Sequence, residues 1–167
     1  MPDRRRGYVR RGEGILPCNP KMAEFYRRDA KHGEVVFTSE VQRVLVAAAR
    51  ALCQQKGWRL HQVMTDKTHV HTLLSWRGFL EWRSVRRSLK YRFTSELNGM
   101  LGNEHPWFSE AGSRKRVRDR KHYDHLMDEY LSKHDGVYWR EDGRTREECL
   151  AMIREKKRKT GDQNHRL

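Results

Sequence analysis

Two histidines separated by one residue, His69 and His71, have the type and spacing that most directly indicate chemistry in this chain. Val70 lies between them and apolar residues follow, a composition that favours a β-strand. Residues two apart in a strand point to the same face, so both imidazoles would project together. Two imidazoles can hold one metal ion and leave positions open for substrate oxygens, as metal-assisted phosphate chemistry requires. Taken alone, such a pair is more often two ordinary polar side chains of a strand.

Tyr130 and His134 supply a phenol and a further imidazole four residues apart. Apolar spacing predicts a helix over 120–134, which would place the two side chains next to each other, one turn apart. A free phenol is a poor nucleophile, and a metal at the histidines would supply charge stabilisation and in-line positioning at a phosphate. The alternative is that both are core residues of the helix. Tyr123 on the same predicted face is a competing nucleophile, but no polar residue follows it four positions later.

The charge balance predicts a polyanionic partner. Lys and Arg total 36 against 22 Asp and Glu, giving a net charge of +14 over 167 residues. Such an excess favours nucleic-acid binding, although basic faces also occur in proteins without that role. The cations expected to contact a nucleic-acid backbone are Arg83, Arg86, Arg87 and Lys90, at helical spacing, and the run of Arg114, Lys115 and Arg116.

Composition excludes several protein classes. The length and a hydrophobic content of 36% predict one compact domain. Three separated cysteines without a Cys-x-x-Cys pair indicate a reducing compartment and no zinc ribbon. We expect no signal peptide and no membrane span, because no apolar stretch is long enough. The predicted location is therefore cytoplasmic, with nucleoid association when the protein is bound to DNA.

Caps and apolar spacing predict the elements around the histidines. A helix over 39–56 is expected after the capping residues Thr38 and Ser39 and before Gly57. Residues 58–64 and the histidine strand are expected to form an antiparallel hairpin. The hairpin would carry the two imidazoles.

Further elements are expected on both sides of this hairpin. Residues 22–28 read as a first strand or, nearly as well, as a turn of helix. A helix over 80–97 follows from a predicted buried stripe of Trp82, Val85, Leu89, Phe93 and Leu97. Residues 113–118 are read as a basic strand and 137–139 as a short one. Thr145 and Glu148 form a capping box that predicts a last helix.

Together these residues resemble the single-tyrosine HUH transposases, particularly the group that includes the REP-associated tyrosine transposases. The likeness rests on the His69-Val70-His71 strand, the basic helix with its Arg-Ser-Leu-Lys run, and Tyr130 followed by His134. It covers roughly residues 35–139. In the family a Met-Pro-Asn/Asp-like turn usually lies directly before the histidines, whereas here Lys67 and Thr68 intervene.

The resemblance implies an α+β fold with a ferredoxin-like antiparallel sheet and helices packed on one or both faces. It implies a Mg- or Mn-dependent attack of Tyr130 on single-stranded DNA beside a hairpin, leaving a 5′-phosphotyrosine link and a free 3′-hydroxyl. The metal ligands would be His69, His71 and His134. The implied organisation is a basic arm over 1–20, a transposase-like domain over 21–144, and a basic helix and tail over 145–167.

Two alternatives stay open from the sequence. A catalytically inactive relative would bind hairpin DNA or structured RNA through the same cations. A structural metal site in a basic RNA-associated protein would make the fold depend on the metal. The resemblance also leaves both a monomer and a homodimer open.

Overall fold

The computed structural model describes residues 8–10, 14–28, 35–109, 112 and 114–164. The chain divides into two compact units, Met1–Val35 and Val36–Leu167. The first unit therefore extends beyond the predicted arm of residues 1–20. The predicted C-terminal helix belongs to the second unit, together with the sheet.

The first unit contains a short hairpin and one helix. Strands β1 (Tyr8–Arg10) and β2 (Gly14–Leu16) pair in antiparallel orientation, and α1 (Pro20–Arg28) follows. The expected strand over 22–28 is wrong, and the helical alternative is right. The Asn19 side chain accepts a hydrogen bond from the Met22 amide at 3.0 Å, and Pro20 begins the helix, so both start signals were present in the sequence. Arg4, Arg5, Arg6 and Arg11 of the predicted arm lie outside the described residues.

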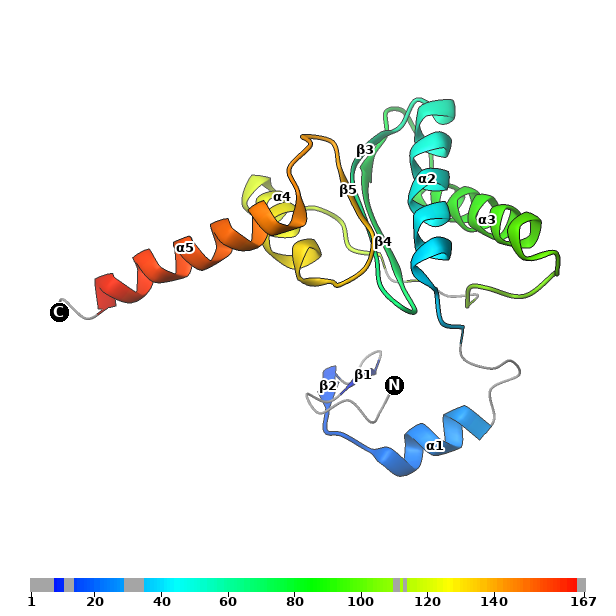
Figure 1. Cartoon of the computed structure of the whole chain (residues 1–167), viewed down its shortest axis with the longest axis horizontal. Coiled ribbons are helices and arrows are strands. Elements are labelled where there is room, and N and C mark those ends of the chain that lie inside the picture. Colours follow the sequence, from blue (N-terminus) through cyan, green and yellow to red (C-terminus); the bar gives the residue numbers. More distant parts are fainter. Residues whose placement is uncertain (1–7, 11–13, 29–34, 110–111, 113, 165–167) are drawn as a thin grey trace. The chain divides into compact units, whose positions relative to one another are not determined.

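The second unit is built on an antiparallel sheet with the strand order β4–β3–β5 (Figure 1). Its strands are β3 (Arg59–Thr65), β4 (Val70–Ser75) and β5 (Tyr138–Arg140). Met64 lies opposite His71 on one side and opposite Tyr138 on the other. The predicted hairpin and the short third strand are confirmed. The α+β class with an antiparallel sheet is confirmed as well.

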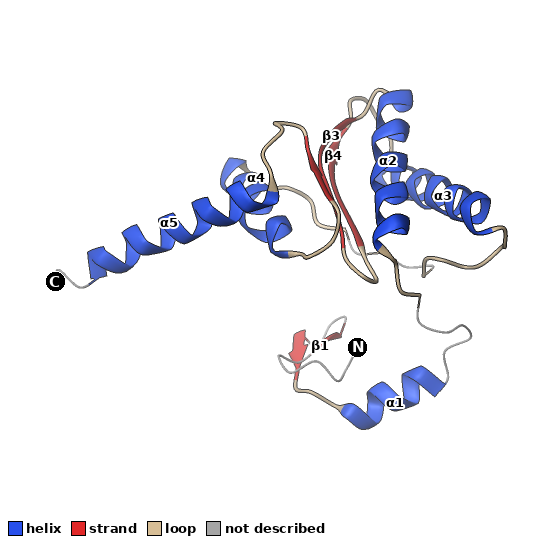
Figure 2. Cartoon of the chain, in the orientation of Figure 1, coloured by secondary structure: helices blue, strands red, loops and turns tan. Residues whose placement is uncertain are grey.

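Helices α2 (Ser39–Lys56) and α3 (Trp82–Leu101) cover one face of this sheet (Figures 1 and 2). The bounds predicted for α2 are confirmed: the Thr38 hydroxyl accepts from the Val41 amide, and Gly57 ends the helix with a φ of 65°. Helix α3 begins two residues later and ends four residues later than predicted. Its stripe of Val85, Leu89, Phe93 and Leu97 is buried, whereas Trp82 is half-buried.

The opposite face of the sheet carries the C-terminal elements (Figure 2). They are α4 (Arg120–His125), the π-helical turn η1 (Leu126–Tyr130), the 3₁₀ turn η2 (Leu131–Lys133) and α5 (Arg146–Asn164). Met64 and Leu73 of the sheet pack there against Met127 and Leu131. The single α-helix predicted over 120–134 is therefore three successive helical types.

Local capping is as predicted, but the basic strand is not. The Asp119 side chain accepts from the His122 amide at 2.8 Å, and Thr145 and Glu148 exchange side-chain-to-amide hydrogen bonds at the start of α5. Residues 114–118 form no strand, and Ser113 lies outside the described residues. In the part of the chain that the structure describes, no helix has the length and apolar character to cross a membrane.

Candidate functional site

The histidine pair lies where the β3–β4 loop enters β4. His71 is the second residue of β4 and His69 immediately precedes that strand. Their ring planes are 7° apart with centroids separated by 6.0 Å, so both imidazoles project from the same side, as predicted. Leu73 continues this face and is buried in the cluster with Met127. The face of the sheet that carries the histidines is therefore the one covered by η1.

Tyr130 and His134 lie at this face, but they do not belong to the single α-helix that the sequence predicted. The Leu131 amide donates to the Leu126 carbonyl, five residues back, so Tyr130 closes a π-helical turn. His134 follows η2 in an extended conformation with φ of −79° and ψ of 148°. The two rings still lie 5.7 Å apart. The expected proximity is present, but it does not come from one α-helical face.

A buried arginine explains the π-helical turn. In an α-helix the Met127 carbonyl would accept from the Leu131 amide. Here it accepts instead from Arg140 Nη1 at 2.6 Å and from the Ser132 hydroxyl at 3.4 Å. Arg140 is 4% exposed and is also held by Asp128 at 2.7 Å. Burial lowers the pKa of Arg140, but its partners, Asp128 first, raise it above the ordinary value, so the guanidinium stays charged.

Four rings meet at this end of the sheet. The centroid of His71 lies 4.4 Å from that of His134 and 6.1 Å from that of Tyr130. The ammonium of Lys115 is 5.6 Å from the Tyr130 ring centroid. Tyr130 is exposed, so its phenol is accessible to a substrate. Three segments far apart in the chain thus bring together a phenol, three imidazoles and a cation.

The electrostatics keep one of these imidazoles neutral. Burial, followed by the proximity of His134 and His69, lowers the pKa of His71 to about 4. Burial raises the pKa of Asp66, but hydrogen bonds from the Lys67 amide and from His134 lower it overall. At neutral pH the site therefore presents a neutral His71 beside an ionised Asp66. His69 Nδ1 lies 2.6 Å from the Thr68 hydroxyl.

The donor chemistry of His69, His71 and His134 fits a first-row divalent ion such as Mn²⁺. Mg²⁺ prefers oxygen and would depend on phosphate and water for most of its ligands. Among the residues described, no three His, Cys, Asp or Glu side chains form a group that could hold a metal ion. The ring planes of His71 and His134 are tilted by 35° with their centroids 4.4 Å apart.

Three of the predicted nucleic-acid-binding cations surround Trp82, the first residue of α3. The guanidinium carbons of Arg83, Arg86 and Arg114 lie 5.4, 4.8 and 5.1 Å from its ring centroid. Arg86 also donates to the Gly112 carbonyl at 3.3 Å, which ties the basic segment to α3.

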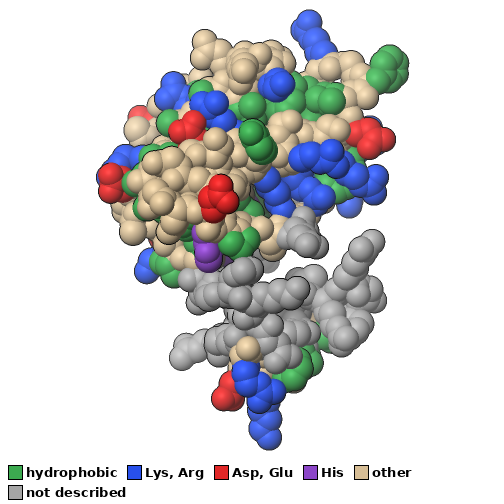
Figure 3. Space-filling view, turned by 90° about the vertical axis from the view of Figure 1, so that its right-hand side faces the viewer, with side chains coloured by type: hydrophobic (Ala, Val, Ile, Leu, Met, Phe, Trp, Pro, Cys, Tyr) green, Lys and Arg blue, Asp and Glu red, His purple; other side chains and the backbone are tan. Residues whose placement is uncertain are grey.

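The remaining predicted cations take different places. Lys90 donates to the Ser109 carbonyl, and Arg87 is exposed on α3. Lys115 and Arg116 border a cavity of about 670 Å³ whose apolar walls include Trp82, Val85 and Leu89. Figure 3 shows Lys and Arg side chains gathered on part of the face it presents.

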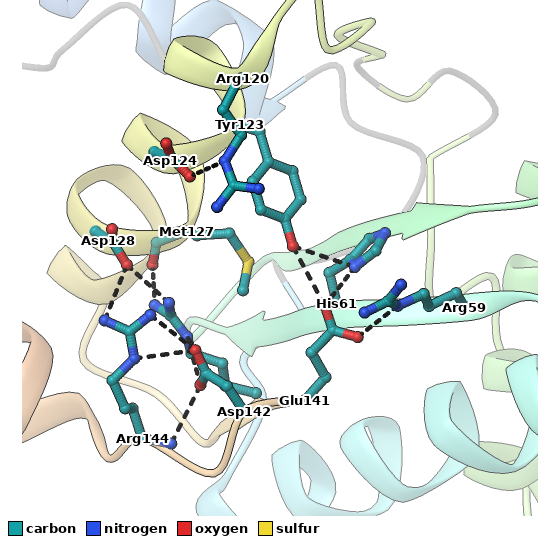
Figure 4. Close-up of a pocket in the computed structure, with 11 residues that line it drawn as sticks. Arg59, His61, Arg120, Tyr123, Asp124, Met127, Asp128, Glu141, Asp142 and Arg144 are labelled. Atoms are coloured by element: carbon teal, nitrogen blue, oxygen red, sulfur yellow. Dashed lines mark hydrogen bonds and ion pairs between the residues drawn. The ribbon is translucent and has the colours of Figure 1, made fainter.

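Sequence reasoning named Tyr123 as a competing nucleophile but missed its partners, His61 and Glu141 (Figure 4). The Tyr123 hydroxyl lies 3.2 Å from both Glu141 Oε1 and His61 Nδ1, at the edge of a cavity of about 450 Å³. Burial, followed by the charge of Glu141, raises the pKa of Tyr123. This phenol therefore holds its proton more firmly than a free phenol, which weakens it as a nucleophile. No spacing signal connects His61 with Glu141, because they are far apart in the chain.

Comparisons of the chain with models of protein families, with curated proteins and with solved structures gave no match.

Proposed function

We propose that this protein is a metal-dependent single-stranded DNA endonuclease and strand transferase that uses Tyr130 as its nucleophile. The observation that supports the proposal best is the meeting of Tyr130 with His71 and His134, with ring centroids 6.1 and 5.7 Å from that of the phenol. The resemblance to single-tyrosine HUH transposases supports the same roles. The proposed partners are single-stranded or hairpin DNA, encountered in the cytoplasm at the nucleoid.

The proposed cleavage step balances without an added energy source. The Tyr130 hydroxyl gives up its proton, its oxygen bonds to the scissile phosphorus, and the bond from phosphorus to the 3′ oxygen breaks. The 3′ oxygen takes up a proton, and the 5′ phosphate stays linked to Tyr130. Attack of a 3′-hydroxyl on this link reverses the step and joins strands.

The chain's own residues contribute position and charge to this step. Lys115, with its ammonium 5.6 Å from the phenol ring centroid, stabilises negative charge that develops on the Tyr130 oxygen. His69, His71 and His134 would hold the divalent ion, which would supply charge neutralisation at the scissile phosphate. The low pKa of His71 keeps its lone pair free for this purpose at neutral pH.

The surface formed by Trp82, Arg86 and Arg114 would bind the part of the DNA strand outside the cleavage site. Bases of single strands stack on aromatic rings, while arginines contact the phosphates. Trp82 with Arg86 and Arg114 offers both groups, next to the segment that carries Lys115 to Tyr130. This surface requires no nucleophile, so it also supports the second candidate, an inactive module that binds hairpin DNA or structured RNA.

A covalent-adduct assay tests the proposal. End-labelled single-stranded DNA hairpins with flanking tails are incubated with the protein and Mn²⁺ or Mg²⁺, then separated on a denaturing protein gel. We expect the label to move onto the wild-type protein, and the adduct to be lost in Tyr130→Phe and in His69→Ala. The matched control is Tyr123→Phe, which removes the other phenol of the same helical run and should leave the adduct.

Two outcomes would contradict the proposal. An adduct that persists in Tyr130→Phe would assign the nucleophile elsewhere. Tight, salt-sensitive hairpin binding without any adduct in either metal would favour the inactive binding module.

A further inference from the structure

The β3–β4 loop fixes a carboxylate beside the histidines. The Asp66 amide donates to the His69 carbonyl at 2.8 Å, which closes the loop that carries the first histidine. Oδ1 of Asp66 accepts from the Lys67 amide at 2.6 Å. The second oxygen, Oδ2, lies 3.3 Å from Nδ1 of His134. One oxygen of Asp66 thus anchors the side chain to its own loop, and the other contacts a predicted metal ligand.

The main chain next to His134 is held against the same end of β3. The Val137 carbonyl accepts from the Thr65 amide at 3.0 Å, and the Val137 amide donates to the buried Gln42 side chain at 3.0 Å. A β-carbon at Gly136 would overlap with the Thr65 carbonyl and with Gln42 Oε1. The backbone distance between Asp66 and His134 is therefore set by the fold, and not only by the two side chains.

This contact selects one form of the imidazole. An ionised carboxylate has no hydrogen to donate and can only accept hydrogen bonds. Nδ1 of His134 must therefore carry the hydrogen in this contact. In the neutral form of the ring, Nε2 is then the nitrogen with the lone pair, available to a metal ion. Ligating histidines commonly donate their other ring nitrogen to a carboxylate, which fixes the ring and raises its basicity.

We propose that Asp66 is the positioning residue of this metal site: it orients His134 through Nδ1, leaves Nε2 free for a divalent ion such as Mn²⁺, and adds a negative charge beside it. The inference rests on the proposed function, because it concerns the same three imidazoles. Asp135 is adjacent to His134 in sequence but pairs with Arg146, so it cannot take this role in the observed arrangement.

The first test measures Mn²⁺ affinity in the full chain. The electron paramagnetic resonance signal of free Mn²⁺ is followed during titration of the wild type, Asp66→Asn, Asp66→Ala and Asp135→Asn. We expect Asp66→Ala to weaken binding about 10- to 100-fold, the range known for such supporting carboxylates. Asp66→Asn should lose less, because its amide oxygen still accepts from Nδ1. Asp135→Asn removes the same charge nearby and should bind Mn²⁺ like the wild type.

The second test reads the imidazole directly, without metal. Nitrogen-15 chemical shifts of the His134 ring should report the form protonated on Nδ1 in the wild type and in Asp66→Asn. Asp66→Ala should lose this preference. A purely structural role of Asp66 would not change which nitrogen is protonated, and Asp66→Asn keeps the test informative if Asp66→Ala does not fold.

Three results would overturn the inference. Mn²⁺ affinity in Asp66→Ala within about threefold of the wild type would exclude a positioning role. A loss far beyond about 100-fold would make Asp66 a ligand itself. A wild type that binds no Mn²⁺ would overturn both this inference and the metal dependence of the proposed cleavage. In the first two cases the Tyr130-dependent adduct would remain, which separates failure of the inference from failure of the proposed function.

Discussion

His71 couples the candidate site to the stability of the fold. Its pKa is lowered from 6.5 to about 4, first by burial and then by His134 and His69. An unfolded histidine takes up a proton near its ordinary pKa, whereas His71 in the folded protein does so only near pH 4. Between these values the unfolded state binds more protons, so the free energy of unfolding must fall as the pH is lowered through this window. Above it, His71 contributes no pH dependence.

We therefore expect His71 to account for a loss of about 2 kcal/mol of stability between about pH 7.5 and about pH 5. Urea unfolding of the wild type and of His71→Gln at both pH values measures this, because the variant lacks the titrating group and should lose correspondingly less. His125→Gln, at an exposed position of α4, is the matched substitution outside the site, and its loss should exceed that of His71→Gln. An equal loss in His71→Gln and in the wild type would contradict the assigned cause.

Residue spacing predicted which side chains of the site lie close together, because strands and helices have fixed periods. The two-residue period of a strand was enough to place His69 and His71 on one face. The four-residue spacing of Tyr130 and His134 predicted their proximity but not its geometry. That geometry depends on Arg140 of β5, which donates to the Met127 carbonyl. A long-range hydrogen bond of this kind leaves no periodic trace in the sequence.

At the scale of elements, residues 134–137, which link η2 to β5, determine the position of His134. Gly136 in this link has no room for a β-carbon against the Thr65 carbonyl and Gln42. We expect Gly136→Ala to destabilise the protein by about 1–3 kcal/mol, because the backbone itself must move. Gly99→Ala, inside α3, is the matched control: nothing lies within 4 Å of the added carbon. It should stabilise by about 0.5–1 kcal/mol through helix propensity.

Thermal unfolding of both variants measures this difference. A Gly136→Ala protein as stable as the wild type would show that the link can move away from β3. The Asp66 to His134 contact would then lose its structural basis. A destabilised Gly99→Ala would instead indicate that α3 does not tolerate a side chain at that position.

Local signals gave the most accurate element bounds. Helix α2 has a side-chain cap and a terminating glycine, both of which act within a few residues. A strand requires a partner, and the basic segment 114–118 has none in the sheet, although its composition allowed one. It contacts α3 instead, where the Arg114 guanidinium lies over the Trp82 ring. Such contacts depend on the tertiary fold and cannot be read from the segment itself.

At the scale of the molecule, charge and stacking make separable contributions to the proposed DNA binding. A net charge of +14 predicts affinity that falls steeply with salt, because each neutralised phosphate releases counterions. Stacking of a base on Trp82 involves no counterion release. Affinity and its salt dependence should therefore respond differently to the loss of an aromatic ring and to the loss of a cation.

We expect Trp82→Ala to weaken binding of single-stranded DNA by about 1–3 kcal/mol while leaving the slope of log affinity against log salt nearly unchanged. Arg116→Gln, at the border of the same cavity, should reduce that slope by about 0.7, the value for one phosphate contact of a single strand. Fluorescence anisotropy with labelled hairpins over a series of salt concentrations measures both quantities. A Trp82→Ala protein with unchanged affinity would remove the base-stacking role of this cavity. A slope that falls as much in Trp82→Ala as in Arg116→Gln would show that the indole acts only by holding its arginines in place.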